Sequence, residues 1–359
     1  MKVQVKTPGK LYLAGEYAVV EAGYPAVIAA VDQYLTVTIE TSDRGSLHSS
    51  QQADLYLTWE RKDSRIQIEG DHPYALIEAA MQATEVYLTA KGYACQGYYS
   101  LAVQSDLDDQ ASGAKYGLGS SGAVTVATVQ ALLAYYGHQL DPLLTYKLAV
   151  LAQTQLGMTG SFGDLAASSF GGLVAYYSVD RSWLSRKIAE QSLLEVLETD
   201  WQGLSIQPIQ LPQSLELMVG WTGRAASTDK LVQEVTGKKS QSDKEGLHQD
   251  FLIASRACVE SMIAGCRTNQ AAVVEEAIVT NRQLLQGFAR GMGLVIETDK
   301  LSQLCQLAIE NGAVAKSSGA GGGDCGICLV RNQNQKKAIQ NAWRKAGIQP
   351  LPLTIAYSE

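Results

Sequence analysis

The amino-acid sequence predicts an α+β protein built from two domains. The chain has 359 residues, more than the roughly 250–300 at which a single hydrophobic core stops growing. Short strand-like segments alternate with segments of helical periodicity, as in α+β proteins. The periodicity weakens between residues 180 and 212, where charged residues, two tryptophans and two prolines stand close together. We therefore expect one domain over residues 1–190 and a second over residues 191–359.

The first half predicts an antiparallel sheet with helices packed on it. Residues 34–41 alternate apolar and polar side chains, which is typical of a strand with one buried face. Residues 123–136 are apolar on nearly every side, which indicates a buried helix, and the acidic stretch 105–115 predicts a loop. The expected strands are 3–5, 10–14, 26–30, 34–41, 97–103 and 172–177, and the expected helices are 73–90, 123–136 and 146–156.

The second half again interleaves strands and helices, which predicts an α+β second domain. Cys325 and Cys328 stand three residues apart in a predicted strand, so their side chains point to opposite faces and would not share one zinc ion. The expected strands are 215–221, 313–317, 325–331 and 353–357, and the expected helices are 231–235, 246–268, 270–288, 298–311 and 335–346.

The composition excludes several classes of partner. The formal net charge is −7 and no run of lysine or arginine exceeds two residues, so nucleic acid is not expected as the main partner. The longest apolar run is far shorter than the roughly 18 residues of a membrane helix, and the first residues lack the apolar stretch of a secretory signal. We expect a cytoplasmic protein with reduced cysteines and no membrane partner, acting on a small molecule as a monomer or small homo-oligomer.

Residues 116–123 (YGLGSSGA) predict a phosphate-binding loop. Glycine lets the backbone turn its N–H groups toward an anion, and the N-terminus of the following helix adds roughly half a positive charge. An ordinary flexible turn has a similar composition, because this glycine spacing alone is a weak signal. The loop consists of Gly117, Leu118, Gly119, Ser120, Ser121 and Gly122.

Three familiar glycine motifs fit this loop poorly. A dinucleotide-binding loop shares the spacing and would use Asp141, about 20 residues further on, but it must follow directly on a buried strand of a βαβ unit. A P-loop needs a glycine five positions before its Gly-Lys and a hydroxyl residue after it, and the pairs at 9–10 and 237–238 have neither. A hydrolase nucleophile elbow needs G-x-S-x-G, which residues 119–122 do not supply.

Two further glycine segments accompany the loop, at residues 8–17 (PGKLYLAGEY) and 318–324 (SGAGGGD). Taken in chain order, the segments at 8–17, 116–123 and 318–324 resemble the three motifs of the GHMP small-molecule kinases. The resemblance spans the whole chain. It implies an N-terminal domain like ribosomal protein S5 domain 2 and a C-terminal ferredoxin-like domain, with the active site in the cleft between them.

The resemblance assigns the catalytic roles to Lys10 and Asp164, whose charges would orient the acceptor and neutralise developing charge near the γ-phosphate. The ATP phosphates would lie on the backbone of residues 117–122, and a hydroxyl of Ser120 or Ser121 would reach Mg²⁺. Helix capping by these serines is the structural alternative, and both roles can coexist. The expected substrate contacts are Lys10, Glu16, Tyr17, Ser161, Arg224, Ser227, Thr228, Gly319, Ala320 and Gly321.

Two features of the sequence indicate which molecule accepts the phosphoryl group. Gln153 stands where the mevalonate-phosphorylating members carry a glutamate that binds Mg²⁺, and residues 220–228 (GWTGRAAST) resemble the members that act on phosphomevalonate. The expected reaction transfers the γ-phosphoryl group of ATP to the phosphate of (R)-5-phosphomevalonate, giving 5-diphosphomevalonate and ADP in the mevalonate route to isoprenoids. Phosphorylation of mevalonate or homoserine, and a non-catalytic nucleotide or metabolite sensor on the same fold, are the alternatives.

Overall fold

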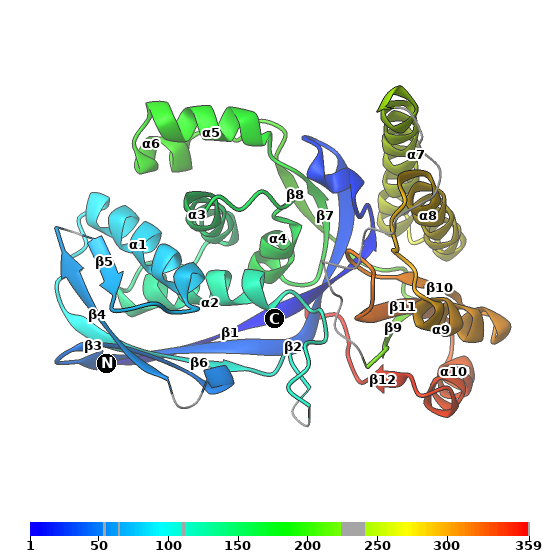
Figure 1. The fold of residues 1–359 in the computed structure, drawn as a ribbon, viewed down its shortest axis with the longest axis horizontal. Helices are drawn as coiled ribbons and strands as arrows, with labels where there is room; N and C mark the ends of the chain where they lie inside the picture. Colours follow the sequence, from blue (N-terminus) through cyan, green and yellow to red (C-terminus); the bar gives the residue numbers. More distant parts are fainter. Residues whose placement is uncertain (53–54, 64, 110–111, 224–240, 358–359) are drawn as a thin grey trace.

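The chain folds around two β-sheets that lie side by side (Figure 1). The computed structural model describes all residues except 53–54, 64, 110–111, 224–240 and 358–359. In that part of the chain, eight strands form the first sheet in the order β5-β4-β3-β6-β2-β7-β8, with β1 paired to β2. These strands are β1 (Lys2–Ala14), β2 (Pro25–Ser42), β3 (Gly45–Ser49), β4 (Tyr56–Lys62), β5 (Arg65–Ile68), β6 (Tyr98–Ser105), β7 (Leu173–Tyr177) and β8 (Ser205–Ile209).

Helices cover one face of the first sheet. They are α1 (Ala75–Ala90), α2 (Ser120–Tyr135), α3 (Pro142–Gln155), α4 (Gly163–Phe170), α5 (Arg181–Glu190) and α6 (Leu193–Glu198). In Figure 1, α2 and α4 lie on β1 and β2, and α1 and α3 pack against α2. α2 buries residues around most of its circumference, which confirms the buried helix expected at 123–136. Among the described helices, none combines the length and the apolar character that a bilayer crossing requires.

The second sheet is antiparallel, with the order β10-β11-β9-β12. Side chains alternate along β11, so Cys325 faces the core shared with the first sheet and Cys328 faces the opposite core, as predicted. α9 and α10 cover the Cys328 face, and α7 and α8 contribute to the shared core. These elements are β9 (Glu216–Trp221), β10 (Val314–Ser317), β11 (Cys325–Val330), β12 (Gln349–Leu351), α7 (Gln241–Arg267), α8 (Ala271–Met292), α9 (Asp299–Glu310) and α10 (Gln333–Lys345).

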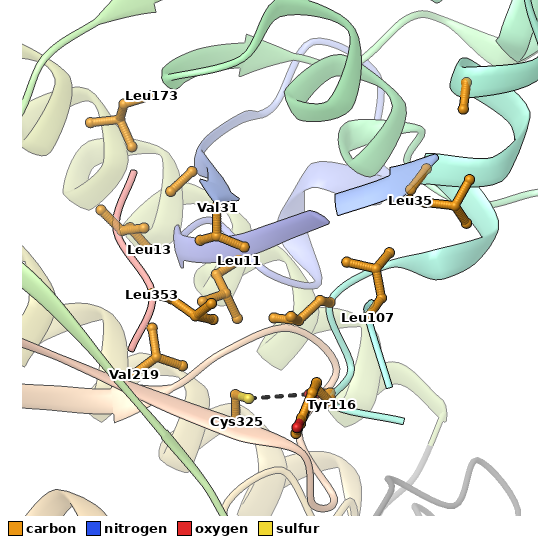
Figure 2. Packing of buried hydrophobic residues seen from close by; sticks show 14 of the residues in the cluster. Leu11, Leu13, Val31, Leu35, Leu107, Tyr116, Leu173, Val219, Cys325 and Leu353 are labelled. Atoms are coloured by element: carbon orange, nitrogen blue, oxygen red, sulfur yellow. Dashed lines mark hydrogen bonds between the residues drawn. The ribbon is translucent and has the colours of Figure 1, made fainter. Parts of the chain in front are cut away.

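One apolar cluster joins the two sheets. Figure 2 shows Leu11 of β1 close to Leu353 and to Val219 of β9, and all three belong to the same buried cluster. At its edge the Cys325 thiol donates to the Tyr116 carbonyl oxygen over 3.1 Å (Figure 2). β1 therefore packs against the second sheet as well as pairing within the first.

Several elements differ from those expected. Segments 3–5 and 10–14 form one continuous strand, β1, and segments 26–30 and 34–41 form β2, because a register shift at Pro8 and Gly9 lets the pairing continue. β3, β4, β5 and α4 were not predicted. The expected irregular region 180–212 contains α5, α6 and β8, and β8 pairs with β7 in the first sheet. The domain limits stay a prediction, and the expected helix 231–235 lies outside the described residues.

Two facing glycines make room for the helices on the second sheet. Gly220 of β9 and Gly326 of β11 are cross-strand partners. A Cβ at Gly326 would lie 2.6 Å from Leu304 Cδ2, and a Cβ at Gly220 would lie 2.8 Å from Leu304 Cδ1. Leu304 and the neighbouring Trp343 are fully buried, so this layer has no spare volume.

We expect Gly326→Ala to lower the free energy of unfolding by about 1–3 kcal/mol, because the added methyl group overpacks a filled core. The matched control is Gly287→Ala in α8, where the glycine is exposed and a Cβ meets nothing within 4 Å. That change should raise the free energy of unfolding by about 0.5–1 kcal/mol, since glycine weakens a helix interior. Chemical denaturation of both variants measures the difference, and a shift of the same sign would contradict this account.

Candidate active site

Lys10 donates hydrogen bonds to the glycine loop from both its backbone and its side-chain nitrogen. Its backbone N–H donates to the Leu118 carbonyl oxygen over 2.8 Å, and its Nζ donates to the Gly117 carbonyl oxygen over 3.1 Å. Nζ also lies 5.7 Å from the centre of the Tyr12 ring. The first two glycine segments, far apart in the sequence, therefore lie side by side.

Residues 117–122 form an uncapped helix start. Gly117 and Gly119 both have a φ of 79°, in the left-handed region that favours glycine. A Cβ at Gly119 would lie 2.8 Å from Lys10 Cε, so glycine also lets Lys10 approach. Gly119 itself is the N-cap of α2 and no side chain caps the helix, so the alternative of capping by Ser120 or Ser121 does not apply. The first N–H groups of α2 are available to an anion.

Asp164, in the first turn of α4, approaches the same loop. A Cβ at Gly122 would lie 2.5 Å from Asp164 Oδ2, so only glycine lets the carboxyl group come this close to α2. Burial raises the pKa of Asp164 above its usual range, and the positive charge of Lys10 opposes part of that shift. Burial thus outweighs the attraction of Lys10, and the charged carboxylate is costly for the folded state.

Tyr12 connects the lysine to the loop before α4. Its hydroxyl shares a 3.0 Å hydrogen bond with the Ser161 hydroxyl. Burial, with a smaller contribution from the charge of Asp164, raises the pKa of Tyr12 above its ordinary value, so the phenol stays neutral. The sequence analysis missed Tyr12, although a residue two positions after Lys10 in a strand lies on the same face.

The turn 318–324 between β10 and β11 approaches Lys10 from the second sheet. Ser318 Oγ accepts from the Tyr12 N–H and donates to the Tyr12 carbonyl oxygen, both over 2.9 Å. A Cβ at Gly319 would lie 4.0 Å from Lys10 Nζ. The Lys10 ammonium group therefore lies between the loop at 117–122 and this turn.

Glu16 and Tyr17, predicted as substrate contacts, hold the same turn. The Tyr17 hydroxyl donates to the Ala320 carbonyl oxygen over 2.6 Å. The Glu16 carboxylate accepts from the Lys316 ammonium and, over 3.3 Å, from the Gly319 N–H. Direct contact of these two residues with the substrate stays a prediction.

The structure divides the predicted site residues into those that lie together, one that packs elsewhere and those outside the described part of the chain. Lys10, Asp164, Ser161 and residues 117–122 lie together, with Gly319 facing them. Gly321 packs against the backbone of residue 296, and a Cβ there would meet the Ile296 carbonyl group. The predicted substrate contacts Arg224, Ser227 and Thr228 lie outside the described residues.

Gln153 is connected to the glycine loop through buried hydrogen bonds. It is 3% exposed, and its Nε2 donates to Thr125 Oγ1 over 3.3 Å. The Thr125 hydroxyl in turn donates to the Ser121 carbonyl oxygen over 2.8 Å. The amide is therefore connected to the first turn of α2 through Thr125.

Both halves of the chain match models of known protein families. Residues 75–172 match the GHMP kinases N terminal domain, and residues 262–349 match the GHMP kinases C terminal domain. A phosphomevalonate kinase of Streptomyces sp. (strain CL190) is 36% identical over 97% of this chain and 96% of its own length. The chain belongs to the GHMP kinase family. The family and the fold predicted from the three glycine segments are confirmed.

Two further relatives of this GHMP kinase are named for different substrates, one for phosphomevalonate and one for mevalonate. The solved structure of Streptococcus pneumoniae phosphomevalonate kinase in complex with phosphomevalonate and AMPPNP is 34% identical, with a TM-score of 0.84 over 98% of this chain and 99% of that one. A Thermococcus sibiricus mevalonate kinase is 27% identical over 99% of this chain and 97% of its own length. Identity to the Streptomyces and Streptococcus phosphomevalonate kinases, 36% and 34%, is higher than identity to this mevalonate kinase.

A cavity of about 860 Å³ in this GHMP kinase adjoins the glycine loop and is lined by Ser120 and Ser121 together with residues 48–52, 73–74, 76–77 and 102–105. Three lining residues bury a polar atom that has no hydrogen-bond partner in the described part of the chain: His48 Nδ1, Tyr74 Oη and Asp108 Oδ1. Buried polar atoms are normally paired, so the cavity suits a polar ligand. Its size and its position beside the uncapped helix start fit the nucleoside part of ATP.

We expect Gly122→Ala to lower kcat/KM for ATP about 10²-fold, because the methyl group would push Asp164 and the loop out of register. The control is Gly246→Ala in α7, where the glycine is exposed and a Cβ meets nothing within 4 Å. Both changes replace a helical glycine, so they share the gain in helix propensity. Initial rates of ADP release at varied ATP concentration measure the effect. Equal rates for the two variants would contradict the proposed role of the Gly122 approach.

Proposed function

We propose that this GHMP kinase transfers the γ-phosphoryl group of ATP to the phosphate of (R)-5-phosphomevalonate, giving 5-diphosphomevalonate and ADP. The observation that carries the proposal is the 36% identity, over nearly the full length of both chains, to a relative named phosphomevalonate kinase. The geometry supports it, because an uncapped helix start, a lysine and an aspartate converge where phosphoryl transfer needs positioning and positive charge.

The reaction forms a bond between an acceptor phosphate oxygen and the γ-phosphorus of ATP, while the bond from that phosphorus to the leaving ADP oxygen breaks. Negative charge spreads over the migrating group in the transition state, and the Lys10 ammonium is placed to stabilise it. The acceptor phosphate has a second pKa of about 6 and is already largely dianionic at pH 7. Asp164 therefore orients Lys10 and the acceptor, and removal of a proton by this carboxylate contributes little.

We also propose that Mg²⁺ accompanies ATP. The described residues contain no group of three or more His, Cys, Asp or Glu side chains placed to hold a metal ion. Mg²⁺ in kinases is commonly bound through substrate phosphates and few protein ligands, so a hydroxyl of Ser120 or Ser121 beside the phosphates fits this role. When bound, the ion would neutralise part of the phosphate charge.

The acceptor phosphate is assigned from sequence chemistry to Arg224, Ser227 and Thr228, which lie outside the described residues. A guanidinium group and two hydroxyls donate hydrogen bonds to a phosphate and add positive charge. Mevalonate and homoserine lack this phosphate, so these residues would distinguish phosphomevalonate from them.

Supplying phosphomevalonate, mevalonate or homoserine with ATP and Mg²⁺ and measuring ADP release tests the proposal. We expect phosphomevalonate to give a kcat/KM at least about 10²-fold above the other two, because phosphate-binding groups without their partner are left unpaired. Turnover of mevalonate or homoserine alone would overturn the proposed acceptor. Binding of phosphomevalonate without ADP release would favour the non-catalytic sensor.

Asp164→Asn and Lys10→Met should affect the reaction unequally. We expect Lys10→Met to lower kcat about 10²–10³-fold, since it removes the charge that stabilises the transition state. Asp164→Asn should lower kcat by no more than about tenfold, because a dianionic acceptor needs no base. A loss for Asp164→Asn as large as that for Lys10→Met would contradict the orienting role.

The same Asp164→Asn variant has a second readout in its stability. Burial raises the pKa of Asp164 in the folded protein, so ionisation at neutral pH destabilises the native state. The variant should therefore melt at a higher temperature than the parent protein at pH 7. The gain should disappear below about pH 4, where the unfolded-state carboxyl is protonated as well. Thermal unfolding across this pH range measures it.

A further inference from the structure

Glu16 and Lys316 form an ion pair that is almost completely withdrawn from solvent. Their side chains are 3% and 0% exposed. Glu16 follows the end of β1 and Lys316 lies in β10, so the pair connects the first sheet to the second. Nothing in the reaction proposed above uses either charge directly.

The pair belongs to a set of contacts that we call the turn clamp, made by Tyr12, Glu16 and Tyr17 on residues 318–320. Lys316 Nζ donates to the Ser317 carbonyl oxygen over 2.6 Å as well as to Glu16. Ser318 Oγ bridges the backbone N–H and carbonyl oxygen of Tyr12, Glu16 accepts from the Gly319 N–H, and Tyr17 donates to the Ala320 carbonyl oxygen. Three consecutive residues of the turn, 318–320, are thus held from the side of β1.

Stability alone does not account for a charged pair at this place. Buried ion pairs can often be replaced by well-packed apolar residues without loss of stability, because both charges must be desolvated. Glu16 Oε2 is also buried without a hydrogen-bond partner among the described residues. Glu16 thus has a carboxylate oxygen without a partner, but its other oxygen fixes the direction of the N–H of Gly319, where a Cβ would lie 4.0 Å from Lys10 Nζ.

We infer that the Glu16–Lys316 ion pair is a positioning element that sets the Lys10 ammonium between the glycine loop and the turn 318–324. The inference rests on the proposed kinase activity. Neither side chain contacts the reacting atoms in this role; both act through Gly319 and Ser317. Loss of the pair lets the turn move away from Lys10, while residues 117–122 keep their own contacts with ATP.

The test replaces the pair by apolar residues in the double variant Glu16→Leu/Lys316→Met. We expect a melting temperature near that of the parent protein, a KM for ATP within about threefold, and a kcat lower by about 10²-fold, the effect of a small misplacement of a catalytic group. The matched control is Arg61→Met/Glu85→Leu, which removes a buried ion pair with exposures of 17% and 7% between β4 and α1. The control should keep the parent kcat.

A folded Glu16→Leu/Lys316→Met variant with the parent kcat would overturn the inference. If this variant does not fold, Ser318→Ala and Glu16→Gln, which keep most of the volume, are measured in its place; a kcat reduced at least about fivefold supports the inference, and the parent kcat overturns it. The parent protein assayed in parallel separates the two questions. Absence of its turnover with phosphomevalonate rejects the proposed function, whereas the ratio of variant to parent kcat, on whichever acceptor is turned over, tests the clamp.

Discussion

The two hydrogen bonds from Lys10 to residues 117 and 118 are the constraint on which the rest of the site depends. The backbone bond fixes β1 along the loop, and the side-chain bond fixes the charge within it. So close an approach leaves little room for a side chain at position 9 or 119, since a Cβ at Gly9 would lie 3.0 Å from Leu118 Cβ and one at Gly119 would lie 2.8 Å from Lys10 Cε. The glycines are therefore needed for packing of the strand against the loop, in addition to any need of the phosphates.

The same strand explains why three distant motifs meet. Within the described residues β1 pairs only with β2, so its other edge has free backbone groups. The outward N–H of Lys10 is used by the glycine loop, and the outward N–H and carbonyl oxygen of Tyr12 are used by Ser318. An unpaired strand edge normally needs to be covered. Here two loops cover it, one from each sheet, and the lysine on that edge lies between them.

Local sequence signals were sufficient to predict the glycine loop but not the cavity beside it. The glycines of residues 117–122 before an apolar helical segment predict the loop from sequence, because a backbone with positive φ, as at Gly117 and Gly119, favours glycine. The cavity requires His48 to meet the start of α1, which depends on the parallel pairing of β3 with β6, far apart in the sequence. α4, with eight residues, is too short for a periodic signal. It begins after Phe162, whose φ of 58° lies in the left-handed region, and no side-chain cap marks its start.

Gln153 is connected to the first turn of α2 through a buried hydrogen bond to Thr125. The Thr125 hydroxyl uses its single hydrogen to donate to the Ser121 carbonyl oxygen, so toward residue 153 it can only accept. The Gln153 amide donates there, which satisfies both groups inside a buried layer. An ionised glutamate has no hydrogen to donate and would set a buried carboxylate against an oxygen lone pair. With this orientation of Thr125, a neutral amide suits position 153, and the first turn of α2 is held by a chain of uncharged hydrogen bonds.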